Sequence, residues 1–292
     1  MSPTFITRRS MLRRSAGAVA LAAGFSTFSP LLAAPAARGF KIGACDWCLG
    51  KRSNPESFEL ARQIGVDGVQ IDMGSAANNM RLVKPEVQQA YRDASRRTGL
   101  AIASLAIGEL NEVPLKSDPR AATWLAQSID VCKALGLPVV LAPAFYKGDL
   151  DMQRTAEIDH FVKVLKETAP KAEKQGVVIG LENYLSAADN RAIIDRVGSP
   201  AVKVYYDVGN STDKGRDVVK EIRALGSLIC EFHAKDGDFM LGRGRIDFKQ
   251  VRKVIDDIQY SGWIQIEAAC PHGLIPDHKT NLKFLKELFP AH

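Results

Sequence analysis

Short apolar runs alternate with longer, partly polar segments along the chain from Phe40 onward. The short runs are rich in β-branched and aromatic residues, which is typical of buried strands. The longer segments have helical apolar spacing, and several begin with Asn-Pro or Asp-Pro or end at glycine. The predicted strands span residues 41–45, 68–72, 101–107, 139–142, 177–182, 202–207, 228–233 and 263–267. The predicted helices span residues 54–64, 84–98, 118–135, 151–175, 187–197, 218–225, 248–258 and 280–289.

This alternation predicts an α/β fold, a closed (β/α)₈ TIM barrel. Strands that alternate with helices form parallel sheets, because each helix carries the chain back to the start of the next strand. Eight strand–helix units over roughly 250 residues suit a closed barrel. The first strand is not followed by the glycine-rich fingerprint of an open dinucleotide-binding sheet. Residues 38–292 contain no linker-like stretch, so one barrel domain is expected there.

Four successive predicted strands end on a residue that can bind a metal. These residues are Glu182, Asp207, His233 and Glu267. A carboxylate at the end of a buried run loses hydration unless it is paired or bound to a cation. The carboxyl ends of all strands lie at one mouth of such a barrel, which is where its active sites are built. We therefore expect the four side chains to converge on a single ion.

Three carboxylates and one imidazole form a mostly hard set of ligands. Such a set suits one divalent ion, Mn²⁺, Mg²⁺ or Co²⁺, while Zn²⁺ stays open. Glu182 and Glu267, at opposite ends of the ligand arc, are candidate acid and base for proton transfer at a substrate carbon. Each residue taken alone could instead be an ordinary polar group that caps a neighbouring helix. Four of them on four successive strands favour the metal site.

The chain resembles the sugar phosphate isomerase/epimerase family, the xylose isomerase-like barrels that include the ketose 3-epimerases. The resemblance is carried by motifs at successive strand ends: Gly-Leu-Glu-Asn at 180–183, Tyr-Asp-Val-Gly-Asn at 206–210, Phe-His-Ala-Lys-Asp at 232–236, Leu-Gly-Arg-Gly at 241–244, Ile-Asp-Phe at 246–248 and Ile-Glu at 266–267. It implies that Glu182, Asp207, His233 and Glu267 hold the metal and that the two glutamates act as acid and base. Two positions differ from the ketose 3-epimerases, which tend to have histidine at Asn210 and an acidic residue at Ala188.

The resemblance predicts a metal-dependent isomerase or epimerase that moves a proton next to a carbonyl of a carbohydrate. A metal-dependent lyase or hydrolase of keto-glycosides is the second enzymatic interpretation. A secreted sugar-binding barrel without catalysis is the third, although simple binding requires no acid/base pair.

Four further residues are candidates for binding the sugar, and each has an ordinary structural alternative. Lys235 follows His233 by two residues and so shares its face of the strand, but it could equally form a salt bridge. Arg243 lies in a glycine-rich loop that could be a plain turn. Trp47 could stack on a sugar or simply pack at the rim. His272 follows the eighth strand and could reach the pocket or remain on the surface.

The N-terminal segment, residues 1–37, is predicted to be an export signal. The paired Arg8 and Arg9 precede a short apolar run, which is followed by Ala-Pro-Ala, the small residues typical of a cleavage site. This pattern indicates the twin-arginine export machinery and a periplasmic protein. The run is too short for a stable membrane span. The segment holds four arginines and no acid, leaving 35 basic and 33 acidic residues and a net charge near +2 in the remainder. That balance predicts no nucleic-acid partner.

Cys45 and Cys48 have redox-motif spacing, and a disulfide between them stays open for an exported protein.

Overall fold

The computed structural model describes Met1 and residues 39–290, so the predicted export segment falls, apart from Met1, outside the described residues. The strands are β1 Phe40–Cys45, β2 Gly68–Asp72, β3 Ala101–Ala106, β4 Val139–Ala144, β5 Val178–Asn183, β6 Val202–Asp207, β7 Ile229–Ala234 and β8 Gly262–Ile266. The α-helices are α1 Ser57–Ile64, α2 Pro85–Thr98, α3 Pro119–Leu135, α4 Thr155–Gln175, α5 Ala187–Val197, α6 Val208–Asp213, α7 Val218–Leu225, α8 Phe248–Asp257 and α9 Leu274–Leu288. Short 3₁₀ helices are η1 Ala76–Asn78, η2 Arg81–Val83, η3 Gly108–Asn111, η4 Tyr146–Gly148 and η5 Gly226–Leu228.

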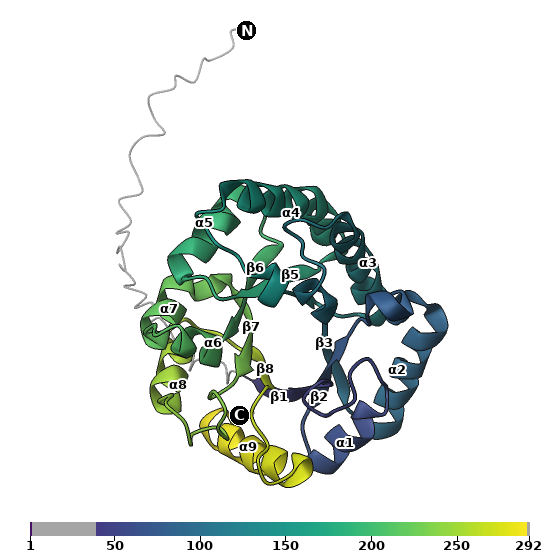
Figure 1. The fold of residues 1–292 in the computed structure, drawn as a ribbon, viewed down its shortest axis with the longest axis vertical. Helices are drawn as coiled ribbons and strands as arrows, with labels where there is room; N and C mark the ends of the chain where they lie inside the picture. The colour runs from purple at the N-terminus through teal and green to yellow at the C-terminus, as the bar shows by residue number, and fades with distance from the viewer. Residues whose placement is uncertain (2–38, 291–292) are drawn as a thin grey trace. The chain divides into compact units, whose positions relative to one another are not determined.

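The strands form a closed parallel barrel in chain order, which confirms the predicted fold class (Figure 1). Closure is made by β1, which pairs in parallel with β2 on one side and with β8 on the other. The register joins Phe40 to Gly262 and Ala44 to Ile266. Because every strand pairs in parallel with its neighbours, every carboxyl end in the sheet faces the same mouth.

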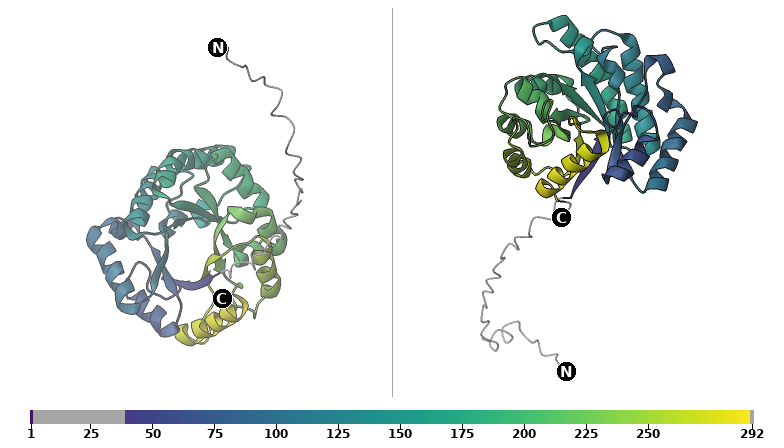
Figure 2. Two further views of the ribbon diagram at one scale, coloured as in Figure 1. Left: turned by 180° about the vertical axis from the view of Figure 1, so that it is seen from behind. Right: turned by 60° about the horizontal axis from the view of Figure 1, so that its bottom comes forward.

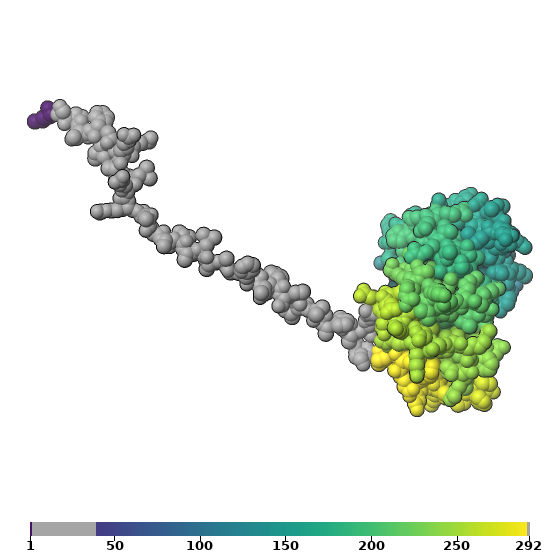
Figure 3. All heavy atoms as spheres, turned by 90° about the vertical axis from the view of Figure 1, so that its left-hand side faces the viewer, coloured from purple at the N-terminus to yellow at the C-terminus, as the bar shows by residue number. Residues whose placement is uncertain are grey.

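The helices lie outside the strands and surround them when the barrel is viewed from either end (Figures 1 and 2). One large apolar cluster fills the space between strands and helices, and a smaller one is built of strand residues alone. On the face shown in Figure 3, atoms from the middle and C-terminal parts of the chain form a continuous surface. None of the described helices is both long and apolar enough to cross a membrane.

Polar side chains occupy buried positions on the strands beneath the mouth. Gln70, Ser104, Glu231 and Gln265 are each at most 1% exposed. Gly43 leaves room for Gln265, since a Cβ at residue 43 would lie 2.0 Å from its Oε1 atom. A TIM barrel is normally filled by branched apolar residues, so this interior is unusually polar.

Helix boundaries differ from the prediction mainly at α9, which begins at Leu274 rather than at residue 280. Gly273 and Pro276 set its first turn, because proline has a helix-compatible φ and needs no hydrogen-bonded N–H there. The short helix α6 was not predicted. It begins directly after β6 because Asp207 caps it, accepting hydrogen bonds from the backbone N–H groups of Gly209 and Asn210.

Glu231 should make stability depend on pH. Burial raises the pKa of its carboxyl from 4.5 to about 7. Between these pH values the folded protein holds a proton that the unfolded chain has released, so stability falls as the pH rises. We expect Glu231→Gln to lose this dependence and to exceed the wild type above pH 7 by roughly 3 kcal/mol or less.

Denaturant unfolding at pH 5 and pH 8 measures this difference. Glu173→Gln, at an exposed position in α4, is the matched control and should follow the wild type. Equal pH dependence in wild type and Glu231→Gln would contradict the expectation.

Candidate functional site

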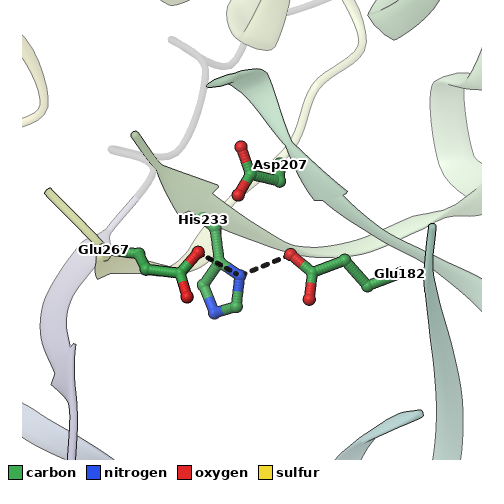
Figure 4. A group of neighbouring side chains, drawn as sticks. All are labelled: Glu182, Asp207, His233 and Glu267. Carbon is green, nitrogen blue, oxygen red and sulfur yellow. Dashed lines mark hydrogen bonds and ion pairs between the residues drawn. The ribbon is translucent and has the colours of Figure 1, made fainter. Parts of the chain in front are cut away.

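The structure brings together the four side chains that the strand ends predicted. Glu182 is in β5, Asp207 ends β6, His233 is in β7 and Glu267 directly follows β8. Each offers a ligand atom, and these atoms all lie within 4.8 Å of one another. The carboxylates of Glu182 and Glu267 lie on opposite sides of the His233 ring, with Asp207 above it (Figure 4). The closed barrel therefore converts four sequence-distant residues into one compact group.

The imidazole of His233 is oriented from below by Gln70. Its Nε2 atom lies 2.8 Å from the side-chain oxygen of Gln70, which also accepts the thiol proton of Cys45 at 3.2 Å. An amide oxygen can only accept, so Nε2 carries the proton and donates it. The lone pair of Nδ1 then points at the carboxylates, 2.6 Å from Glu182 and 3.6 Å from Glu267. A lone pair facing carboxylate oxygens this closely requires a proton or a cation between them.

Glu267 is held in place by one hydrogen bond and one ion pair from residues that line the pocket. The indole N–H of Trp47 donates to Oε1 at 2.9 Å, and the Lys235 ammonium lies 3.6 Å from Oε2. The alternative role expected for Lys235, a salt bridge, is thus present, because the lysine pairs with a glutamate. That glutamate belongs to the site, so the pair also brings the lysine to the pocket.

Asp207 has one oxygen satisfied and one without a partner among the described residues. Oδ1 accepts the backbone N–H groups of Gly209 at 2.6 Å and Asn210 at 2.9 Å. Oδ2 is buried and has no hydrogen-bond partner. Leaving a buried carboxylate oxygen unpaired costs several kcal/mol unless a cation binds it.

The pKa values of the two glutamates are shifted in opposite directions by their surroundings. Burial raises the pKa of Glu182 and, more strongly, that of Asp207, where the neighbouring carboxylates add to the effect. Burial also acts on Glu267, but the charges of His233 and Lys235 and the Trp47 hydrogen bond outweigh it and lower the pKa of this carboxyl. Burial disfavours a charged His233, yet Glu182 and Glu267 raise its pKa to about 10, so Nδ1 holds a proton unless a cation takes its place.

These features fit a divalent cation. Three carboxylates crowded around one imidazole repel one another unless positive charge lies among them. The imidazole lone pair and the unpaired Oδ2 of Asp207 both face the group, and oxygen-rich sets of this kind suit Mn²⁺, Mg²⁺ or Co²⁺. The contact between His233 and Gln70 is the type of outer hydrogen bond that orients a metal-binding histidine.

A pocket of about 230 Å³ opens above the group. Its floor includes Glu182 and Glu267, and Asn210 lies on its wall. Its other lining residues are Trp47, Arg52, Asp72, Ala106, Gly108, Asn111, Leu141, Pro143, Phe145, Tyr146, Tyr184 and Lys235. Two of the four candidate sugar-binding residues, Trp47 and Lys235, therefore line this pocket, and their binding of a sugar stays a prediction. Ala188 is exposed on α5 and does not line this pocket.

Arg243 and His272 do not line this pocket. Arg243 is exposed, in a loop closed by Asp236, whose carboxylate accepts the backbone N–H groups of Gly242, Gly244, Arg245 and Ile246. The His272 side chain is 75% exposed and lies 3.4 Å from Asp277. For both residues the surface alternative agrees with the geometry.

Several residues of the site were not singled out from the sequence. Gln70 and Asp72 both belong to β2, and the rule that flagged the four strand-end ligands would also have flagged them as polar residues in a buried run. Arg52 and Tyr184 come from loops and Tyr146 begins the short 3₁₀ helix η4, where neither periodicity nor spacing indicates the direction of a side chain. Cys45 and Cys48 are free thiols, and Cys45 contacts the site through Gln70.

Known proteins with similar sequences include sugar phosphate epimerases. A 2-epi-5-epi-valiolone 7-phosphate 2-epimerase from Actinoplanes sp. is 28% identical over 205 residues, covering 68% of this chain and 73% of that protein.

Solved structures with the same fold include ketose and ketoglucoside epimerases. A D-psicose 3-epimerase from Clostridium cellulolyticum, solved with D-tagatose, superposes with a TM-score of 0.72 at 19% identity, covering 85% of this chain and 99% of that one. The 3-keto-D-glucoside 4-epimerase YcjR of E. coli superposes with a TM-score of 0.71 at 16% identity, covering 85% and 99%.

A family model described as the xylose isomerase-like TIM barrel matches residues 58–288. That span begins in α1, ends with α9 and contains all four converging side chains. The chain belongs to the xylose isomerase-like TIM barrel family.

Proposed function

We propose that the protein is a divalent-metal-dependent sugar epimerase or isomerase that moves a proton on the carbon next to a carbonyl. The observation that carries this proposal is the pair of glutamates at the pocket floor. They lie 2.6 Å and 3.6 Å from one imidazole nitrogen, on opposite sides of the His233 ring. The epimerases among the relatives support the same class of reaction.

Glu182, Asp207, His233 and Glu267 would hold the metal. When bound, the ion would polarise the carbonyl and hydroxyl oxygens of the sugar and so acidify the neighbouring C–H.

The chain's own residues would then carry the proton. Trp47 and Lys235 keep Glu267 ionised and fix its orientation, so Glu267 takes the proton from carbon and leaves a planar enediolate. Glu182, whose pKa is raised, delivers a proton to the opposite face, which inverts the carbon. The sugar then regains its carbonyl, and the two glutamates have exchanged protonation states. An acid and a base with separated pKa values are what such a transfer needs.

Replacing either glutamate by glutamine should abolish this chemistry. We expect Glu182→Gln and Glu267→Gln each to lower proton exchange by 10²–10⁴-fold or more, because each removes one partner of the transfer. Metal-loaded protein is incubated with ketoses and with 3-keto-glycosides in deuterated water, and deuterium in the recovered sugar is measured. Glu173→Gln serves as the control.

The same experiment separates the competing functions. Deuterium in an intact sugar supports epimerisation or isomerisation, whereas release of a free aglycone would indicate a lyase or hydrolase. A wild type that binds sugar without exchange, and a Glu267→Gln variant with unchanged affinity, would support a sugar-binding barrel.

Gln70 should control metal affinity without touching the ion. We expect Gln70→Met to weaken Mn²⁺ binding about 10–100-fold, because His233 would lose the acceptor that fixes its tautomer. Competition against a chelator measures the affinity. Gln88→Met is the matched control, since Gln88 is also buried but bonds to the backbone oxygen of Leu82. Equal losses in both variants would show a general effect of packing.

We also propose that the protein is exported to the periplasm by the twin-arginine machinery, on the evidence of the N-terminal sequence. Replacing Arg8 and Arg9 by lysine should keep the protein in the cytoplasmic fraction of a host with this machinery. Replacing Arg13 and Arg14 by lysine is the control and should leave export intact. Unchanged fractionation of the first variant would contradict this route.

A further inference from the structure

The position of Tyr146 at the pocket rim calls for an explanation. Its side chain is 76% exposed, although a large aromatic ring normally stabilises a protein by being buried. Its φ angle is +52°, a left-handed conformation that is uncommon for residues other than glycine. Such backbone strain costs about 1–3 kcal/mol and concentrates at ligand-binding positions.

The surrounding loop holds Tyr146 in this conformation. The backbone N–H of Phe145 donates to the side chain of Asn111 at 3.0 Å, and that of Gly148 donates to the carbonyl of Phe145 at 2.7 Å. Gly148 packs against the 3₁₀ helix η3, where a Cβ would lie 3.0 Å from the carbonyl of Leu110. Lys147 pairs with Glu112 at 2.8 Å. The loop is therefore fastened on both sides of the exposed ring.

The neighbouring aromatic rings pack together, and the ring of Tyr146 stays exposed at this part of the rim. The rings of Phe145 and Tyr184 pack together with centroids 4.6 Å apart, and Lys214 lies 4.3 Å over Tyr184. Phe145 is only 8% exposed. A ligand that extends out of the pocket on this side would meet Tyr146.

The charged residues that line this pocket do not form a binding site for a phosphate group. The two cations that line this pocket each have a carboxylate neighbour: Lys235 lies 3.6 Å from Glu267, and Arg52 lies 4.0 Å from Asp72. A phosphate ester carries about −1.5 to −2 charge at pH 7 and usually binds clustered arginines or backbone amides.

The loop after β7 supplies backbone amides, but the chain itself occupies them. In TIM barrels the loops after the seventh and eighth strands frequently bind phosphate. Here Asp236 accepts hydrogen bonds of 2.9–3.1 Å from the backbone N–H groups of four residues: Gly242, Gly244, Arg245 and Ile246. A carboxylate of the protein thus already fills this nest of donors.

We propose that the substrate is an uncharged keto sugar with an apolar or second-ring substituent, such as a keto-glycoside, and that the substituent stacks on Tyr146. This inference rests on the proposed function and narrows its substrate class. It separates the chain from relatives named for phosphorylated substrates, such as the 2-epi-5-epi-valiolone 7-phosphate 2-epimerase.

Two pairs of ligands test the proposal on the full-length, Mn²⁺-loaded protein. The first pair is methyl and phenyl 3-keto-β-D-glucopyranoside, and the second is D-ribulose and D-ribulose 5-phosphate. Calorimetry measures affinity, and deuterium uptake measures exchange. We expect the phenyl glycoside to bind about five- to tenfold more tightly than the methyl glycoside, as ring stacking predicts. D-ribulose should bind at least as tightly as its phosphate.

Variants then test whether the preference for the phenyl glycoside depends on the ring of Tyr146. Tyr146→Ala should reduce the phenyl preference below about twofold, by weakening the phenyl glycoside more than the methyl glycoside, whereas Tyr146→Phe should retain the preference. Phe239→Ala is the matched control, because Phe239 is 52% exposed and does not line this pocket. Equal binding of the two glycosides, equal losses for both in Tyr146→Ala, or tighter binding of the phosphate would overturn the proposal.

Failure of this inference can be told apart from failure of the proposed function. Exchange with a strong preference for ribulose 5-phosphate would keep the epimerase and overturn the uncharged substrate. A phenyl preference that depends on Tyr146, without exchange on any sugar, would keep the rim site and overturn the epimerase.

Discussion

The site depends on the mutual repulsion of three carboxylates around one imidazole, two of them buried and that of Glu267 partly exposed. Glu182, Asp207 and Glu267 each present an oxygen to the space where the Nδ1 lone pair of His233 points. Protons alone could relieve this repulsion, but a divalent ion relieves it while also using the unpaired oxygen of Asp207. The same arrangement leaves two glutamates on opposite sides of the centre, which is the geometry that a two-sided proton transfer requires.

The closed barrel is what makes this crowding tolerable. Four strands fix the backbone positions of the four groups, so the cost of ordering them is met by packing throughout the domain rather than at the site. Beneath them, Gln70 and Cys45 position the imidazole, and the wider polar interior continues down to Glu231. The site is therefore supported by a buried polar layer as well as by its own ligands.

The fold and the converging residues could be predicted because both follow from strand periodicity. Each strand end in a parallel barrel points to the same mouth, so Glu182 and His233 could be placed together without a structure. Loop residues follow no such rule. Arg243 is turned outward by a loop that folds around Asp236, and Tyr146 is exposed because Asn111 and Gly148 fasten its loop. These contacts join residues whose proximity the sequence pattern does not reveal.

The loop around Asp236 depends on a single side chain for the pairing of several backbone donors. Four backbone amides remain aimed at one point, and a single side chain of the protein neutralises them. Loss of that one carboxylate would leave the four donors without their acceptor. A substitution at this one position would therefore change the charge and the hydrogen bonding of the loop without replacing any of the four converging side chains.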